Sequence, residues 1–206
     1  MPRKVDHDQR RRHIVEALLR ITSVRGLDAI SLREVAHEAG VSMGAVQHYF
    51  ATKDDMLLFA LHQWLRLSVH DRFTARVESR IAAEATESPT AVLRAIAAEY
   101  LPHDEVTRAE VRISVAFLSR AAVEPALAPY IAAAFAGFTR SLHDLFQSTG
   151  LSRDPAAEAQ RLAALLDGLR LPVLVGALSY QDALAVVNRH LTLVGTDEQN
   201  HEPTDP

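Results

Sequence analysis

No glycine or proline occurs between Ala45 and Ser88, and this uninterrupted run limits what the chain can fold into. Glycine and proline are the least favourable residues in a helix interior. The run is far longer than an ordinary strand, which spans about 3 to 10 residues. The chain as a whole is rich in helix formers, with 33 alanines and 26 leucines among 206 residues. We therefore expect an all-α protein.

Glycines, prolines and N-capping residues divide the chain into segments with a helical apolar period. Gly26 and Gly40 each follow a segment of this kind, and Pro89 opens another. The expected helices cover residues 8–25, 32–39, 42–50, 53–83, 89–101, 104–122, 125–148, 155–177 and 180–194.

Composition and charge exclude several classes of protein. Because cysteine is absent, disulfides, iron–sulfur clusters and cysteine-based zinc sites are ruled out. There is neither an apolar stretch of 18 residues nor a signal peptide, so we expect a soluble cytoplasmic protein without a membrane span. Residues 1–53 hold nine Lys/Arg and six Asp/Glu, a net charge of +3, whereas residues 54–206 hold 13 and 20, a net charge of −7. A basic N-terminal quarter fits local contact with a polyanion.

The segment LREVAHEAGVSMGAVQHYF, residues 32–50, has the spacing of a helix-turn-helix. Ser31 and Glu34 predict a capping box at the start of its first helix. Ala36 is small enough for two steeply crossed helices to touch, and Gly40 can adopt the positive φ of a tight turn. The other inner positions are apolar and seal the contact between the helices: Val35, Ala39, Val41 and Val46. The outer face of the second helix is not needed for this packing and can bind another molecule.

The longer stretch ISLREVAHEAGVSMGAVQHYFATKDDML, Ile30 to Leu57, resembles the DNA-binding domain of the TetR family of bacterial transcriptional repressors. It has the serine that opens the second helix, the A-x-x-A-G-V-S turn, the aromatic pair that ends in Phe50, and K-x-x-L from Lys53. Gln47 departs from the pattern, because tyrosine often occupies this position in the family. Further along, LLDGLRLPVLVG (Leu165–Gly176) faintly resembles the choline-responsive betaine repressors of the same family.

The resemblance implies a helix-turn-helix DNA-binding domain at residues 1–52, with the helix from Ser42 to Tyr49 in the major groove. Gln47 could pair with adenine, Met43 and Ala45 could meet a thymine methyl, and Gly44 permits close approach. Phosphates would be held near the helix ends. The expected DNA-binding residues are Ser31, Arg33, Ser42, Met43, Gly44, Ala45, Gln47, His48, Tyr49 and Lys53, with nonspecific attraction from Arg3, Lys4 and Arg10 to Arg12.

Some of these residues have a purely structural interpretation. Tyr49 occupies an apolar position and is as well suited to the core as to DNA, and Phe50 is expected to be core. Ser31 would cap its helix with or without DNA. Arg10 to Arg12 also fits a solvated helix face.

The resemblance further implies that residues 53–195 form a helical domain for ligand binding and dimerisation, followed by a disordered tail at 196–206. In this family the last two long helices pair across a two-fold axis to make a homodimer. The periodicity places the following residues on the candidate dimer face, although an intramolecular core would give the same pattern: Leu162, Leu165, Leu166, Leu169, Val173, Val186, Val187, His190, Leu191 and Val194.

The long helix that begins at Lys53 is the expected lever between a small-molecule effector and DNA. Aromatic residues and arginines within apolar helices are the candidate effector contacts, and core packing is the competing interpretation for each. They are Trp64, Tyr100, Arg112, Phe117, Phe135, Phe138 and Arg170. The sequence names neither the effector nor the operator.

Two other functions remain open at this point. One is an all-α protein-interaction module, and the other is a non-haem metal-binding helical enzyme, because Glu-x-x-His spacing occurs at Glu34–His37 and Glu198–His201. The first pair lies on a two-turn helix and the second in the polar tail, so neither points inward from a bundle helix. Common hydrolase and nucleotide-binding motifs are also absent. We therefore expect no enzyme activity, no metal and no cofactor.

Overall fold

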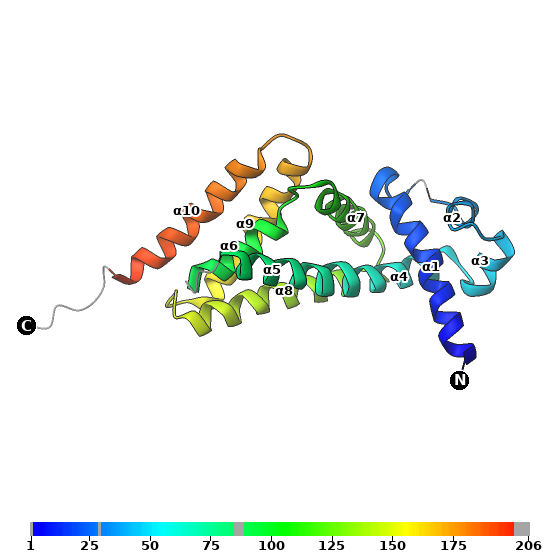
Figure 1. The fold of residues 1–206 in the computed structure, drawn as a ribbon, viewed down its shortest axis with the longest axis horizontal. Helices are drawn as coiled ribbons and strands as arrows, with labels where there is room; N and C mark the ends of the chain where they lie inside the picture. Colours follow the sequence, from blue (N-terminus) through cyan, green and yellow to red (C-terminus); the bar gives the residue numbers. More distant parts are fainter. Residues whose placement is uncertain (1, 29, 85–88, 200–206) are drawn as a thin grey trace, which may run out of the picture. The chain divides into compact units, whose positions relative to one another are not determined.

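A computed structural model of the chain describes residues 2–28, 30–84 and 89–199, and all regular structure in these ranges is helical (Figure 1). This confirms the all-α expectation. The elements are α1 (Pro2–Arg25), α2 (Leu32–Glu38), α3 (Met43–Tyr49), α4 (Lys53–Trp64), the π-helix η1 (Leu65–Arg72), α5 (Phe73–Glu84), α6 (Pro89–Tyr100), α7 (Glu105–Ala121), α8 (Ala128–Thr149), α9 (Pro155–Leu174) and α10 (Tyr180–Gln199).

The chain divides into two compact units. Unit 1 contains Met1–Arg72 and Ala109–Ile131, and unit 2 contains Phe73–Arg108 and Ala132–Pro206. Unit 1 therefore includes α4 and η1 in addition to the residues 1–52 expected for the DNA-binding domain.

Both ends of the chain differ from the expected helix bounds. The first helix begins at Pro2 rather than residue 8, and the last runs to Gln199 rather than residue 194. Helix therefore covers the first four residues of the expected disordered tail, 196–199, while residues 200–206 lie outside the described part.

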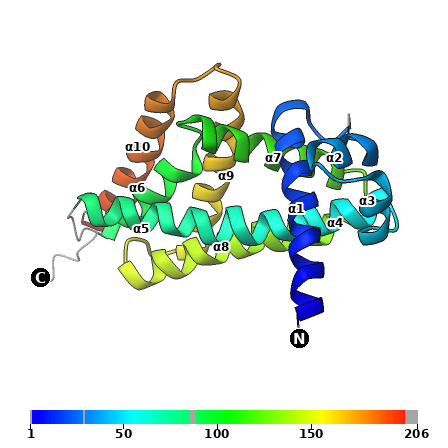
Figure 2. The ribbon, with the colours of Figure 1, turned by 45° about the vertical axis from the view of Figure 1, so that its right-hand side comes forward.

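In unit 1, one face of α1 packs on the helix-turn-helix and on α4. Figures 1 and 2 show α2 and α3 on the same side of α1. Ile14 and Leu18 are fully buried there and belong to one apolar cluster with Val35, Val46 and Phe50. Each large side chain buried in this way contributes about 1.5 to 3 kcal/mol relative to exposure. The cluster fixes the orientation of α3.

The segment 53–83 was expected to be one α-helix. It is helical throughout, but its hydrogen-bond pattern changes from α to π at η1 and returns to α in α5. Within η1, the carboxylate–guanidinium pair Arg66–Asp71, at 3.8 Å, joins residues five apart, which fits i→i+5 geometry. No glycine or proline marks the change. π-Helices are rare, and the short π-bulges that occur inside α-helices are frequently found at functional sites.

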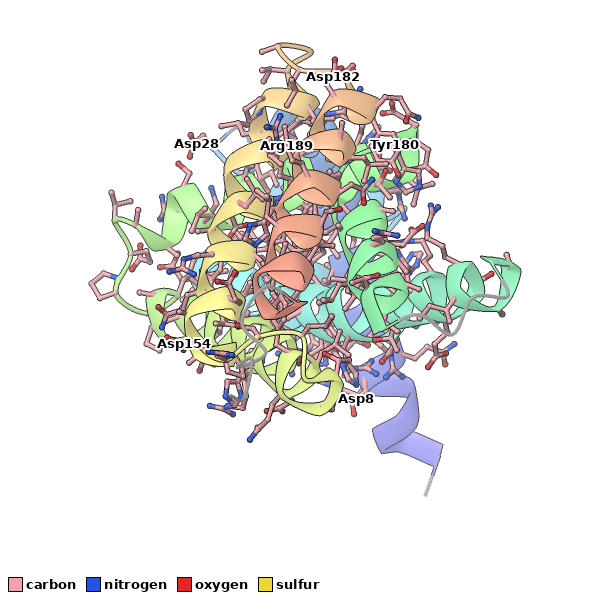
Figure 3. All side chains as sticks on the ribbon, turned by 90° about the vertical axis from the view of Figure 1, so that its left-hand side faces the viewer. Asp8, Asp28, Asp154, Tyr180, Asp182 and Arg189 are labelled. Carbon is pink, nitrogen blue, oxygen red and sulfur yellow. The ribbon has the colours of Figure 1, made fainter. Side chains whose placement is uncertain are left out.

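In unit 2, α9 and α10 form a helical hairpin that packs on α6 and α8. Gly176, at φ +77°, adopts the left-handed conformation that ends α9. The core between these helices includes Leu93 on α6 and Leu142 and Phe146 on α8, all fully buried. Figure 3 looks onto α9 and α10, which lie side by side.

This core corrects the expected dimer face. A side chain with almost no exposed area in one chain cannot contact a second chain, and the intramolecular interpretation of the periodicity therefore holds for the fully buried half of that face. Leu162, Leu166, Val173, Val187 and Leu191 are at most 1% exposed, and Leu165, Leu169, His190 and Val194 are half-buried. Among the predicted residues Val186 is exposed.

None of the described helices is long and apolar enough to cross a membrane.

Candidate functional site

The turn between α2 and α3 has the geometry that the sequence predicts. The Ser31 hydroxyl accepts a hydrogen bond from the Glu34 backbone N–H at 3.2 Å, and the Glu34 carboxylate accepts one from the Ser31 N–H at 3.0 Å. Gly40 follows α2 with φ +65°, and the Val41 N–H then bonds the Ala36 carbonyl at 3.0 Å. Ser42 starts α3 by accepting from the Ala45 N–H at 3.1 Å. The two helices are thus held by local hydrogen bonds.

The contacts of the capping box also change the pKa of the Glu34 carboxyl. Hydrogen bonds from the Ser31 backbone and hydroxyl, together with the Arg25 guanidinium at 3.1 Å, lower the pKa of the Glu34 carboxyl from its usual value. The carboxylate is therefore engaged in capping. This use disfavours the metal interpretation of Glu34–His37, and the described part of the chain contains no group of three His, Asp or Glu that could hold a metal ion.

The outer face of α3 is open in unit 1. Met43, Gly44, Gln47 and His48 are exposed, whereas Val46 on the opposite face is fully buried. Ala45 is half-buried. Short, polar and flexible side chains therefore occupy a helix surface held from behind by an apolar core.

Groups suited to phosphate flank this face. Ser31 and Arg33 are exposed at the start of α2, and Ser42 is exposed at the start of α3. Lys53 is half-buried in the first turn of α4, where Thr52 accepts a hydrogen bond from the Asp55 N–H at 3.0 Å. The predicted DNA-binding residues therefore lie on one unit, at the exposed face of α3 and at adjoining helix starts.

Tyr49 fits both of its interpretations. Its ring is half-buried and packs against the core of unit 1, and it also meets exposed rings. His48 lies edge-on to it, with ring centroids 5.1 Å apart, and His7 lies edge-on at 4.8 Å.

His7 was not predicted, because the expected first helix began after it. Since α1 starts at Pro2, its early turns reach the end of α3. The only available sequence signal was spacing: His7, Arg11, Ile14 and Leu18 fall on one helical face. The side chains of Arg3 and Lys4 lie outside the described part of the chain.

Arg11 has a packing role that differs from the expected nonspecific attraction. Its guanidinium carbon lies 4.1 Å from the centroid of Phe59 and 4.9 Å from that of Phe50. Such cation–π contacts stabilise by about 0.5 to 2 kcal/mol each. Arg11 therefore anchors α1 to the end of α3 and to α4.

The candidate effector residues divide between the two units. In unit 1, Trp64 stacks on Phe117 at 6.1 Å, and both are buried in the core. The Trp64 indole N–H is buried without a hydrogen-bond partner in the described part, immediately before η1. Arg112 is half-buried on α7.

In unit 2, the structure brings three predicted residues together around one ring. Tyr100 stacks on Phe138 at 4.8 Å, and the Arg170 guanidinium lies 4.8 Å from the Tyr100 centroid. The Tyr100 hydroxyl donates a hydrogen bond to the Asp167 carboxylate at 2.6 Å, and Asp167 also pairs with Arg170 at 3.5 Å. Burial raises the pKa of the Tyr100 phenol, so it remains a donor. Phe135, the seventh predicted residue, is exposed on α8.

Two buried carboxylates in unit 2 were also missed. Glu99 pairs with Arg76 at 3.1 Å and with Arg80 at 2.6 Å, which joins α5 to α6. Glu158 on α9 pairs with His190 on α10 at 3.5 Å. Sequence spacing cannot reveal pairs that tertiary packing creates.

Comparisons with known proteins agree with this geometry. Residues 14–60 match the family described as bacterial regulatory proteins, tetR family, and residues 88–195 match the BetI-type transcriptional repressor C-terminal family. The chain is 35% identical over 176 residues to the HTH-type transcriptional regulator PksA of Bacillus subtilis (strain 168), covering 83% of this chain and 82% of PksA. It is 33% identical over 203 residues to the HTH-type transcriptional regulator BetI of Paraburkholderia phymatum, covering 94% of this chain and 97% of BetI.

The fold also matches a solved structure. A transcriptional regulator from Saccharomonospora viridis, in complex with choline, superposes with a TM-score of 0.72 at 21% identity, covering 95% of this chain and 97% of that one. At this identity the likeness concerns the fold alone.

Proposed function

Because the chain belongs to the TetR family of bacterial transcriptional regulators, we propose that it is a repressor that binds a palindromic operator as a homodimer and leaves it when a small molecule binds. The protein is a sequence-specific DNA-binding regulator of transcription. The observation that carries the proposal is the exposed face of α3, where Gln47 and its neighbours lie on a helix that Ser42 caps and the buried Val46 anchors from behind. We propose that the protein binds its operator in the cytoplasm, where the DNA would be.

Enrichment of bound duplexes from random-sequence DNA tests the proposal directly. A repressor of this kind enriches a two-fold symmetric sequence whose half-sites lie about 34 Å or a multiple apart. Failure to enrich any sequence would contradict operator binding. Enrichment of a single asymmetric half-site would contradict the dimer alone.

Gln47→Ala and Lys53→Ala should both weaken binding to the enriched operator, but in different ways. Gln47 faces outward on α3 and can read a base, so its loss should relax preference at one symmetric pair of positions and cost about 1 to 3 kcal/mol there. Lys53 contacts a phosphate, so its loss should weaken all operator variants about equally and lower the salt slope by about 1 per protomer. Fluorescence anisotropy on operator variants at several salt concentrations measures both. Equal losses across all variants for both proteins would refute the assigned roles.

The dimer would use the exposed face of the α9–α10 hairpin, on the side away from its core. Exposed positions on α9 and at its C-cap repeat at alternating intervals of four and three, which is the spacing of a helix-packing seam: Ala164, Gly168, Leu171 and the C-cap residue Val175. On α10, Val186 and Leu193 are exposed in the same way. The two small residues would let a helix of a second copy approach closely.

For the effector, we propose a site at Tyr100 in unit 2. The Tyr100 ring, which stacks on Phe138, already binds one cation, the Arg170 guanidinium. The Asp167 carboxylate beside it supplies the opposite charge. An organic cation such as choline, which the Saccharomonospora viridis regulator holds, would compete with Arg170 for both groups.

Tyr100→Phe should reduce the response to such a cation and leave DNA binding without it unchanged. The variant keeps the ring stack and removes the hydroxyl that holds the Asp167 carboxylate in place beside the ring, through a charge-assisted bond of about 1.5 to 3 kcal/mol. The concentration of choline that releases the operator should therefore rise about tenfold or more. Tyr130→Phe, whose ring lies against His62 in unit 1, is the matched control. An unchanged response in Tyr100→Phe would assign Tyr100 to the core, and no release of the wild-type protein by choline or other organic cations would contradict the proposed effector class.

Transmission would pass along α4, whose first turn carries Lys53 and whose last residue, Trp64, adjoins η1. Because the Trp64 indole N–H has no partner among the described residues and the π register begins beside it, this end of α4 can exchange between two hydrogen-bonding states. An effector that favours one state would shift the balance between DNA-bound and released forms.

A further inference from the structure

We propose that His7 on α1 is a further DNA-contacting residue, which binds a backbone phosphate beside the end of the recognition helix α3. The observation is a cluster of three rings in unit 1. The His7 ring lies edge-on to Tyr49 at 4.8 Å and to His48 at 6.4 Å, and His48 and Tyr49 are 5.1 Å apart. His7 and His48 are exposed.

The contacts of α1 hold His7 in this place. One turn further along the same face, the Arg11 guanidinium lies over Phe59 and Phe50, and beyond it Ile14 is buried. Phe50 directly follows α3, so two successive turns of α1 are fixed to the end of the recognition helix. An imidazole that is already fixed in the free protein loses less conformational entropy on binding than one on a flexible segment.

The position within a helix-turn-helix decides which part of DNA this imidazole meets. The first residues of a recognition helix contact base edges in the major groove. His48 and Tyr49 are the last two residues of α3, so the ring cluster lies towards the end that leaves the groove. Phosphate oxygens are the acceptors there, and an imidazole can donate to one from either ring nitrogen. The expected contact is therefore independent of base sequence.

Charge adds a pH dependence to this contact. Only a protonated imidazole carries the charge that displaces a counterion from DNA, so the contact is tested at two pH values. The titratable groups that meet His7 from α3 are His48 and Tyr49, and along α1 its charged neighbours in sequence are Asp8, Arg10 and Arg11. The contribution of His7 is isolated by comparing the wild-type protein with a variant at each pH.

The test uses His7→Gln, His7→Lys and the control His62→Gln, each as the full chain, on the duplex enriched from random-sequence DNA. His62 is also exposed in unit 1, but its ring lies against Tyr130 on α8. At pH 6, His7→Gln should bind roughly threefold to tenfold more weakly, and its salt slope should fall by about 0.9 per protomer. At pH 8 the loss should be smaller and the slope unchanged. His7→Lys, with a fixed charge, should restore the slope at both values.

Three results would overturn the proposal. The first is binding by His7→Gln that matches His62→Gln at both pH values. The second is a loss in His7→Gln that is equal at pH 6 and pH 8 and is not restored by His7→Lys, because His7 then only packs α1 against Tyr49. Operator variants should all be affected alike, and a loss confined to one base position would also exclude a phosphate contact.

Discussion

The double variant Leu171→Glu/Val186→Glu should be a monomer that no longer binds its operator tightly. Leu171 and Val186 are 48% and 43% exposed in the single chain, so glutamate is tolerated there without loss of the core. In the proposed dimer both positions are buried, and four carboxylates would be desolvated across the two-fold axis. Sedimentation should give the 22.7 kDa of one chain at micromolar concentration, where the wild-type protein gives twice that mass.

Operator affinity should fall with the loss of the dimer. Linking two DNA-binding units raises the affinity for two half-sites by about 100-fold to 10,000-fold through effective concentration, with no additional contact. Leu118→Glu is the matched control, because Leu118 on α7 is 40% exposed and lies outside the α9–α10 face. A double variant that remains a dimer, or a monomer that binds the full operator as tightly as the wild-type protein, would contradict the proposal.

A core substitution separates this face from the one that periodicity alone suggests. Leu162 is fully buried between α9 and its neighbours in unit 2. Leu162→Ala should therefore lower the free energy of unfolding by about 2 to 5 kcal/mol and leave the folded protein dimeric. The sequence shows that α9 has an apolar stripe, but not which helix covers it. The exposed seam is less apolar, since it includes Ala164 and Gly168, and for that reason a hydrophobic pattern does not reveal it.

Local features of the DNA-binding unit were predictable because their causes lie within a few residues. The Ser31–Glu34 capping box, the positive φ of Gly40 and the buried Val46 each follow from side chains close in sequence. The exposed face of α3 was predictable for the same reason, because it consists of the α3 residues that do not occupy the apolar inner positions. Sequence and structure therefore agree best where the fold is decided locally.

Features decided by tertiary contacts were not predictable. The start of α1 at Pro2 has no strong cap or apolar signal, yet it brings His7 to Tyr49. The π register of η1 appears in a segment with ordinary helix formers. At the effector site, the sequence supplied Tyr100, Phe138 and Arg170 as separate candidates, and only packing unites them with Asp167. Sequence spacing predicts which residues share a helix face, but only the tertiary structure shows which residues that face contacts.

Gly44→Ala should make the protein more stable and its DNA binding weaker. Among the described residues, a Cβ added to Gly44 would meet the Ser42 hydroxyl oxygen at 3.9 Å and no other atom within 4 Å, so the folded chain accepts a methyl group there. Alanine is favoured over glycine in a helix by about 0.5 to 1 kcal/mol, which should raise the free energy of unfolding. If the α3 backbone approaches a base pair at Gly44, the same methyl group occupies space that DNA requires. Operator affinity should then fall about tenfold or more, the loss expected when 1.4 kcal/mol or more is removed.

Gly137→Ala separates the two effects of the added methyl group. Gly137 is exposed on α8 in unit 2, and a Cβ there would meet nothing within 4 Å. This control should gain similar helix stability and keep wild-type operator affinity. Thermal unfolding and anisotropy on the enriched duplex give the two quantities for each variant. Wild-type or tighter binding by Gly44→Ala would mean that DNA does not approach the backbone at this position, since the fold itself offers no reason to exclude a side chain there.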